Sequence, residues 1–157
     1  MRITVASGVG QGPTPLAAFD AALLAAGVEN YNLIPLSSVI PARAVVTRAR
    51  FGSRSDEYAH RLYVVIARCD VAEVGQHAWA GLGWTQESES GRGLFVELHA
   101  HDKRDLEQSI DATLESMKSR RSCEYGKNET ELAGTVCNGP PACAVVIACY
   151  SSERWRA

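Results

Sequence analysis

Three consecutive segments between residues 60 and 101 look like β-strands, and they constrain the fold more than any other feature of the chain. The segments read HRLYVVIARCDV, HAWAGLGWTQES and GLFVELHAH. Each has alternating or continuous apolar character, and glycine-bearing breaks separate some of them, as is typical of strands and turns. Strands that follow one another so closely favour antiparallel pairing, so the sequence predicts a mostly antiparallel sheet.

A helix is predicted on each side of these strands. Thr14 offers an N-cap hydroxyl, Pro15 suits the first helical position and Gly27 suits the position after the last turn. They frame a helix over residues 14–27, TPLAAFDAALLAAG. The face expected against the sheet, with spacings of three and four, consists of Leu16, Phe19, Leu23 and Ala26. Residues 102–121 predict a second helix that begins at Asp102 and has apolar positions at Leu106, Ile110, Leu114 and Met117.

Shorter elements complete the predicted architecture. A first strand over residues 2–7 ends in the glycine-rich turn GVGQGP, and further strands cover residues 31–34, 43–48 and 142–150. Loops cover residues 50–58 and the segment after the second helix. Two helices on mostly antiparallel strands make a single α+β domain over residues 1–157. We expect another sheet or a subunit to cover the second face of the sheet.

Composition indicates which classes of partner and which cellular compartment to expect. Sixteen Lys and Arg stand against eighteen Asp and Glu, which gives a formal net charge of -2. This balance offers no electrostatic case for nucleic acid or an anionic membrane, which leaves small molecules or copies of the chain. The chain has neither a signal-peptide pattern nor an apolar run of ~20 residues, so the expected compartment is the cytoplasm. Its five cysteines are odd in number and lack a CxxC pair, which indicates small buried hydrophobes.

Two motifs have a functional and a plainer interpretation. GVGQGP follows a predicted strand and precedes a helix, as phosphate-binding loops do. It lacks the Lys-Ser/Thr ending of a P-loop and the GxGxxG spacing of dinucleotide folds, so a tight turn is the preferred interpretation. His99 and His101 share one face of a strand, as in the beginning of a metal site. No third ligand accompanies them at a spacing typical of metal sites, and we therefore expect no metal.

Two carboxylates stand in apolar segments. Glu97 interrupts the run Leu94-Phe95-Val96, and apolar surroundings would raise its pKa and suit it for proton donation near neutral pH. A solvent-facing glutamate fits the periodicity as well. Asp20, in the alanine- and leucine-rich helix, is either an anion for a cationic ligand or a solvated helix residue.

Residues 8–41, GVGQGPTPLAAFDAALLAAGVENYNLIPLSSVIP, resemble the N-terminal signature of the pyruvoyl-dependent arginine decarboxylases. The resemblance is carried by the glycine-rich segment, the TPLxAFDxALLxAG helix, the NLI strand and two serines followed by two apolar residues and a proline. Residues 93–97, GLFVE, resemble the GLxxE segment of that family. Residues 51–90 and the tail resemble it only in size and element order.

The resemblance implies that the chain cuts itself between Ser37 and Ser38 into residues 1–37 and 38–157. In the implied chemistry, the Ser38 hydroxyl attacks the carbonyl carbon of Ser37 to form an ester. β-Elimination then leaves a dehydroalanine, and hydrolysis converts it to a pyruvoyl ketone. Position 38 needs a β-heteroatom for the attack. A strained turn would tilt the peptide toward attack, although strain is not visible in a sequence.

The implied cofactor is this covalent pyruvoyl group, used without pyridoxal phosphate. It forms a Schiff base with the amino group of the substrate, and its conjugated carbonyl accepts the electrons left by departing carbon dioxide. The resemblance implies that Glu97 donates the proton, that Asp20 pairs with the substrate guanidinium and that Asn32 serves processing or positions the pyruvoyl. It also implies trimers or hexamers with active sites at subunit boundaries, and an αββα sandwich.

The sequence therefore predicts a self-processing decarboxylase that converts L-arginine to agmatine and carbon dioxide, in polyamine synthesis or acid resistance. One alternative keeps the pyruvoyl group and changes the amino acid, which an Asp20→Ala variant would discriminate. A second alternative is an unprocessed homologue without enzyme activity, which would remain one intact chain. A metal or redox protein built on His99, His101 and the cysteines is a third, and it would contain bound metal.

Overall fold

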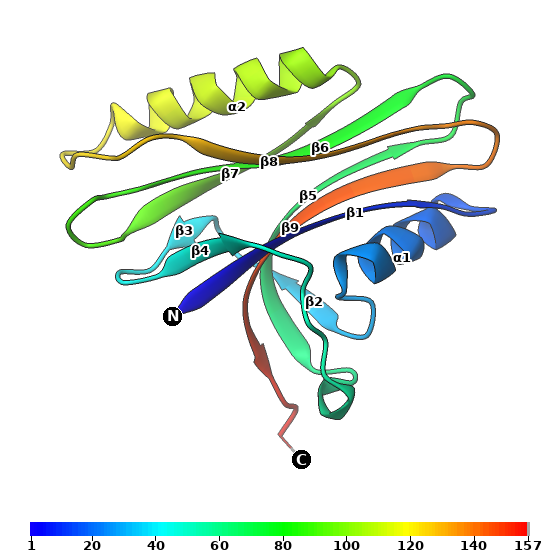
Figure 1. Cartoon of the computed structure of the whole chain (residues 1–157), viewed down its shortest axis with the longest axis horizontal. Coiled ribbons are helices and arrows are strands. Elements are labelled where there is room, and N and C mark those ends of the chain that lie inside the picture. Colours follow the sequence, from blue (N-terminus) through cyan, green and yellow to red (C-terminus); the bar gives the residue numbers. More distant parts are fainter. Residues whose placement is uncertain (157) are drawn as a thin grey trace.

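A computed structural model describes residues 1–156 as two stacked β-sheets with a helix outside each sheet (Figure 1). In chain order the elements are β1 (Arg2–Gln11), α1 (Pro15–Ala26), β2 (Asn32–Pro35), β3 (Val39–Ile40), β4 (Val45–Arg48), a 3-10 turn (Ser55–Glu57), β5 (Arg61–Val71), β6 (His77–Gln86), β7 (Gly93–Ala100), α2 (Lys103–Lys118), β8 (Glu129–Val136) and β9 (Ala142–Glu153). The predicted α+β class and the αββα arrangement are confirmed.

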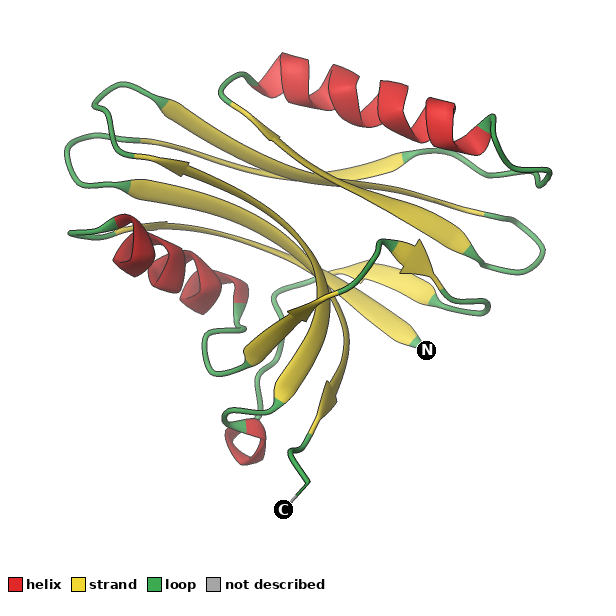
Figure 2. Cartoon of the chain, turned by 180° about the vertical axis from the view of Figure 1, so that it is seen from behind, coloured by secondary structure: helices red, strands yellow, loops and turns green. Residues whose placement is uncertain are grey.

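The strands within residues 1–156 divide between a sheet of order β2-β5-β9-β1-β4 and a sheet of order β3-β7-β6-β8. Pairing is antiparallel except for β1 with β4 and β2 with β5. The three segments that dominated the sequence pattern are β5, β6 and β7, and β6 and β7 are paired as neighbours. Seen from behind, the chain crosses from one sheet to the other between β2 and β3 (Figure 2).

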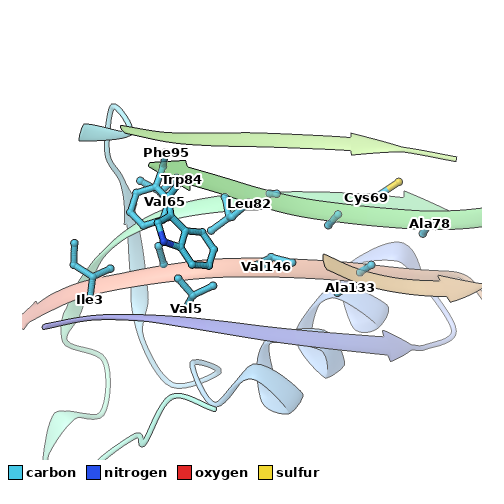
Figure 3. Packing of buried hydrophobic residues seen from close by; sticks show 14 of the residues in the cluster. Ile3, Val5, Val65, Cys69, Ala78, Leu82, Trp84, Phe95, Ala133 and Val146 are labelled. Carbon is cyan, nitrogen blue, oxygen red and sulfur yellow. The ribbon is translucent and has the colours of Figure 1, made fainter. Parts of the chain in front are cut away.

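Three apolar clusters hold the layers together. The largest lies between the sheets and includes Trp84, Phe95 and Val146 (Figure 3). A second cluster lies between α1 and its sheet, and a third, built on Leu106, Ile110 and Leu114, lies under α2. Each sheet is thus buried on both faces, one by its helix and one by the other sheet. This arrangement meets the expectation that a second sheet would cover the first.

The glycine-rich segment is part of a strand, which corrects the predicted turn. β1 continues through Gly8 and Gly10 to Gln11 and pairs with β9 over this length. A Cβ atom built on Gly8 or Gly10 would collide with the backbone of Ala22 in α1. The glycines are therefore needed because the helix and the strand approach closely. In a sequence, glycines required for close packing look the same as glycines required for a turn.

The boundaries of α1 were predicted correctly, and its buried face was predicted correctly at Leu23 and Ala26 but not at Leu16 and Phe19. The Thr14 hydroxyl accepts a hydrogen bond from Ala17 N, and Gly27 has the left-handed φ of 87° expected after a helix. The buried residues are Ala18, Ala22, Leu23 and Ala26. Leu16 is 72% exposed and Phe19 is only partly buried, and the positions of α1 closest to Gly8 and Gly10 of β1 are alanines.

Strand β8 was missed in the sequence, which predicted a loop before β9. Its segment, ETELAGTV, mixes polar and apolar residues, and only Ala133 within it is buried. Because β8 lies at the edge of its sheet, one side of the strand is free of pairing and its pattern is weak. Helix α2 matches its prediction, including the Asp102 cap. No helix within residues 1–156 is long and apolar enough to cross a bilayer.

The cysteines behave as the composition predicted. All five are free thiols, and all except Cys123 are buried. Cys143 and Cys149 lie on the same face of β9, against α1. Burial raises the pKa of each of these two thiols to about 12, so both stay protonated and inert at neutral pH.

Candidate functional site

The two adjacent serines lie where the chain passes from one sheet to the other. β2 ends at Pro35 in the first sheet, and β3 begins at Val39 in the second. Leu36 N donates to Val64 O in β5 at 2.8 Å, and Ser38 O accepts from Phe95 N in β7 at 2.8 Å. The crossing is therefore tethered to a strand at both ends, and the peptide between Ser37 and Ser38 lies inside the tethered span.

Ser38 has a left-handed backbone conformation, with φ of 60°. For a residue with a Cβ this conformation costs about 1–2 kcal/mol, because the Cβ approaches the following carbonyl oxygen. Such a residue keeps its conformation only when neighbouring contacts fix it. Strain of the kind that would favour attack, which the sequence alone could not reveal, is thus present at the second serine.

Glu97 lies directly beside the Ser38 hydroxyl. Phe95 points into the core between the sheets and Val96 points toward α2, so alternation along β7 turns Glu97 to the same side as Phe95. The Ser38 Oγ donates to the Glu97 carboxylate, with both carboxylate oxygens 2.7 Å away. Residues 59 positions apart in the chain thus form one hydroxyl–carboxylate pair.

The surroundings of Glu97 match the second of the two alternatives that the sequence left open, a glutamate that faces solvent. The side chain is exposed in the single chain, beyond the buried run from Gly93 to Val96. A small cavity of about 270 Å³ lies at this place, lined by Ser38, Phe95, Val96, Glu97, Leu98, Thr113 and Met117. The cavity has apolar walls from β7 and α2 but opens to solvent, because β3 covers only the first residues of β7.

Tyr150 is a neighbour of the pair that sequence reasoning did not identify. Its hydroxyl donates to Val39 O at 3.0 Å, and its ring meets the Phe95 ring edge to face at 6.2 Å between centroids. Burial, and then the negative charge of Glu97, raise the pKa of the Tyr150 hydroxyl above its ordinary value. In the sequence this tyrosine is only the last residue of an apolar run, so no local signal distinguished it.

The other two predicted site residues stand apart from the serine. The Asn32 side chain donates to Ala59 O at 2.8 Å rather than to Ser38. Asp20 lies on the exposed side of α1, in line with the exposed Leu16 and Leu24. Within residues 1–156 the structure brings Ser38 and Glu97 into contact, but it gives neither Asp20 nor Asn32 a hydrogen bond to them.

Neither the His99–His101 pair nor the GVGQGP segment forms a ligand site within residues 1–156. The His101 ring nitrogen Nδ1 lies 2.8 Å from His77 O. Among residues 1–156 no cluster of three or more His, Cys, Asp or Glu side chains is arranged to hold a metal ion. GVGQGP has its glycines packed against α1 rather than open toward a ligand.

Comparisons with known proteins identify relatives over nearly the whole chain. The family model described as pyruvoyl-dependent arginine decarboxylase matches residues 2–154. A protein of that name from Halobacterium salinarum is 47% identical over 96 residues, which cover 61% of this chain and 59% of the relative. Another from Thermococcus kodakarensis is 29% identical over 147 residues, covering 93% of this chain and 92% of the relative. A solved pyruvoyl-dependent histidine decarboxylase aligns with a TM-score of 0.45 and 13% identity, over 66% of this chain and 58% of the other.

Proposed function

Because the chain belongs to the pyruvoyl-dependent arginine decarboxylase family, we propose that it is a self-processing decarboxylase that converts L-arginine to agmatine and carbon dioxide. The observation that carries the proposal is the Ser38–Glu97 hydrogen bond at a residue with φ of 60°. A serine hydroxyl, the carboxylate that accepts its hydrogen bond and a left-handed backbone meet at the predicted cleavage site.

In the proposed processing, the Ser38 Oγ attacks the carbonyl carbon of Ser37. The peptide bond breaks, and the nitrogen of residue 38 takes up the hydroxyl proton, so that residues 1–37 are held by an ester. Removal of the Cα proton of residue 38 then breaks the Cβ–O bond and releases residues 1–37 with a terminal carboxylate. Addition of water and loss of ammonia leave a pyruvoyl group at position 38. The Glu97 carboxylate, 2.7 Å from the hydroxyl, accepts its hydrogen bond and orients it before the attack, a role that does not require proton transfer to Glu97.

Residues around position 38 fit the turnover that this cofactor supports. A pyruvoyl group supplies an electron-accepting carbonyl for decarboxylation, which no ordinary side chain offers. Glu97 holds the proton that the substrate Cα receives after carbon dioxide departs. Phe95 N, which donates to Ser38 O at 2.8 Å, orients the carbonyl of residue 38. Val96, Leu98 and Met117 form the apolar walls beside the site.

The charge of the substrate favours the small cavity at Ser38 over a larger one nearby. A cavity of about 590 Å³ lies beyond Val39, and its walls include Arg92, Arg120 and Arg121. Three guanidinium groups would repel the cationic side chain of arginine. The cavity at Ser38 contains the carboxylate of Glu97 and no basic residue. We therefore place the substrate there.

We propose that a neighbouring subunit completes the site, in a trimer or a hexamer. Asp20 and Asn32 are exposed in the single chain and make no hydrogen bond to Ser38 or Glu97 within residues 1–156. A subunit boundary at this edge would cover Glu97 and supply a carboxylate for the substrate guanidinium. Asp20 matches that need, because a planar carboxylate makes two parallel hydrogen bonds with a guanidinium.

The five free thiols support a reducing compartment such as the cytoplasm.

Intact-mass analysis of the purified protein tests the proposal. The expected result is two fragments, residues 1–37 and residues 38–157, with the second blocked by a pyruvoyl group. A single unbroken chain of 157 residues under native conditions would overturn the proposed function.

An Asp20→Ala variant tests the substrate: we expect its preference for arginine over lysine and ornithine to fall roughly 10- to 100-fold, as for loss of a charged hydrogen bond. Undiminished selectivity would remove Asp20 from this role.

Mixing an inactive variant with an impaired one tests the subunit boundary. Ser38→Ala subunits lack the cofactor precursor, and Asp20→Ala subunits lack the proposed guanidinium partner. If each site takes these residues from different subunits, co-expressed variants form some complete sites and regain part of the arginine decarboxylation. Recovery would be absent if one subunit supplied both residues.

A further inference from the structure

The carbonyl of Val39 accepts its hydrogen bond from a side chain of the opposite sheet. Successive carbonyls along a strand point in opposite directions within the sheet plane. Ser38 O points toward β7, where Phe95 N donates to it, so Val39 O points to the outer edge of β3. β3 is the last strand of its sheet within residues 1–156. The acceptor at this edge is occupied by the Tyr150 hydroxyl, at 3.0 Å.

Tyr150 reaches this position from an irregular place in β9. The pairing of β5 with β9 changes register at this point: Tyr63 faces Ser151 and Val64 faces Cys149. Tyr150 is therefore the extra residue of a β-bulge. On the other side of β9, pairing with β1 begins only at Cys149. Bulges bend a strand and change the direction of a side chain, and they are frequent next to active sites. Here the bulge directs the tyrosine across the gap between the sheets.

The contacts around Ser38 act together on its backbone. Phe95 N holds Ser38 O, Tyr150 holds Val39 O, and the edge-to-face rings of Phe95 and Tyr150 keep these two donors in fixed relation. A non-glycine residue keeps a positive φ only where its surroundings determine it. Because the carbonyl of Val39 lies one residue beyond the strained serine, fixing it limits the rotation that would release the strain.

We propose that Tyr150 is a positioning residue for self-cleavage, which holds Val39 so that Ser38 stays in the left-handed conformation in which its hydroxyl meets Glu97. This inference rests on the proposed function. Tyr150 touches neither the scissile carbonyl nor the substrate in this role and acts only through Val39. The raised pKa of its hydroxyl keeps it protonated, and hence a donor, across the physiological range.

The test is the rate of cleavage in a Tyr150→Phe variant, which keeps the ring and removes the hydroxyl. The chain is made by cell-free synthesis, and conversion into residues 1–37 and 38–157 is followed by intact mass. We expect cleavage to be roughly tenfold slower, the effect of losing the one hydrogen bond that holds this carbonyl. The matched control is Tyr63→Phe, beside the same bulge, whose hydroxyl donates to Glu153 at 2.8 Å. It is expected to cleave at the wild-type rate.

A second measurement separates positioning from general destabilisation. Both tyrosine variants are also made in the uncleavable Ser38→Ala background, and their thermal midpoints are compared. Slow cleavage of Tyr150→Phe with a midpoint close to that of Tyr63→Phe supports the inference. Cleavage of Tyr150→Phe at the wild-type rate, or a slowing that only follows a lower midpoint, overturns it while leaving the proposed function intact. Failure of the wild-type chain to cleave would instead overturn the proposed function.

Discussion

Two serine–glutamate hydrogen bonds join distant parts of this chain, and their surroundings differ. Ser38 Oγ lies 2.7 Å from Glu97, and Ser7 Oγ lies 3.0 Å from Glu131. Ser7 is in the regular part of β1, and Glu131 is in β8, so their bond connects the two sheets. Ser38 lies on the crossing between the sheets, with φ of 60°. The same pair of functional groups is therefore held by a relaxed strand in one place and by a strained segment in the other.

The second difference is the presence of a cation. Arg48 Nε lies 3.4 Å from Glu131, while Arg48 Nη1 lies 2.8 Å from Glu129, and its guanidinium is stacked over Trp84 at 4.5 Å. Within residues 1–156 no lysine, arginine or histidine forms an ion pair with Glu97. Arg48 therefore holds Glu131 in an ion-pair network, whereas within residues 1–156 Glu97 has the Ser38 hydroxyl and no cation as its partner. The comparison separates a structural pair from one suited to chemistry.

The largest expected contrast comes from removing each hydroxyl. Ser38→Ala has no β-heteroatom, so we expect cleavage to stop completely and the chain to stay intact. Ser7→Ala is expected to cleave at the wild-type rate, because its hydroxyl only joins β1 to β8. Intact mass after purification distinguishes the two. Cleavage of the Ser38→Ala chain at the same peptide bond would contradict the comparison.

Replacing each carboxylate by its amide gives the next largest contrast. The Gln side chain in Glu97→Gln still accepts a hydrogen bond from Ser38, so we expect self-cleavage to survive. Proton delivery is lost, and turnover of arginine should fall by roughly 10²–10⁴-fold. Glu131→Gln should leave turnover unchanged. Carbon dioxide release by cleaved protein is the measurement, and full activity in Glu97→Gln would mean that another group delivers the proton.

The smallest expected effect comes from removing the cation of the structural pair. Arg48→Met leaves Glu129 and Glu131 without their partner and removes the stacking on Trp84. Because these charges are partly exposed, we expect a loss of about 1 kcal/mol in the free energy of unfolding. Urea denaturation of the Ser38→Ala and Ser38→Ala/Arg48→Met proteins measures it. The rate of self-cleavage in otherwise wild-type protein should not change, and a large change would connect the two regions.

Local chemistry explains which parts of the fold could be predicted. The ends of α1 depend on Thr14, Pro15 and Gly27, whose preferences act within a few residues, and all three occupy the predicted positions. The glycines of β1 were misinterpreted because their reason is a helix packed against them, which adjacent residues do not reveal. The exposure of Leu16 has a related origin: its spacing fits a buried face, but α1 approaches β1 most closely through its alanines, and Leu16 lies outside that contact.

In the candidate site, too, some residues could be identified from the sequence and others only from the structure. The resemblance to a family identified Ser38 and Glu97, and the structure places them in contact. The sequence left open whether Glu97 is surrounded by apolar residues or faces solvent, and the structure shows it exposed in the single chain, because β3 pairs only with Gly93 and Leu94 of β7. Tyr150 could not be predicted, since its role depends on a register change between β5 and β9.

The sequence by itself determined the chemical groups and the local elements: two adjacent serines after a short strand, a glutamate in an apolar run, and helices with defined ends. Only the tertiary structure decided that Ser38 has a left-handed backbone, that Glu97 faces its hydroxyl and that Tyr150 holds the next carbonyl. The physical reason is the separation in sequence over which each interaction acts. Caps and side-chain chemistry belong to single residues and their neighbours, whereas a contact across 59 or 111 positions depends on how the sheets pair and stack.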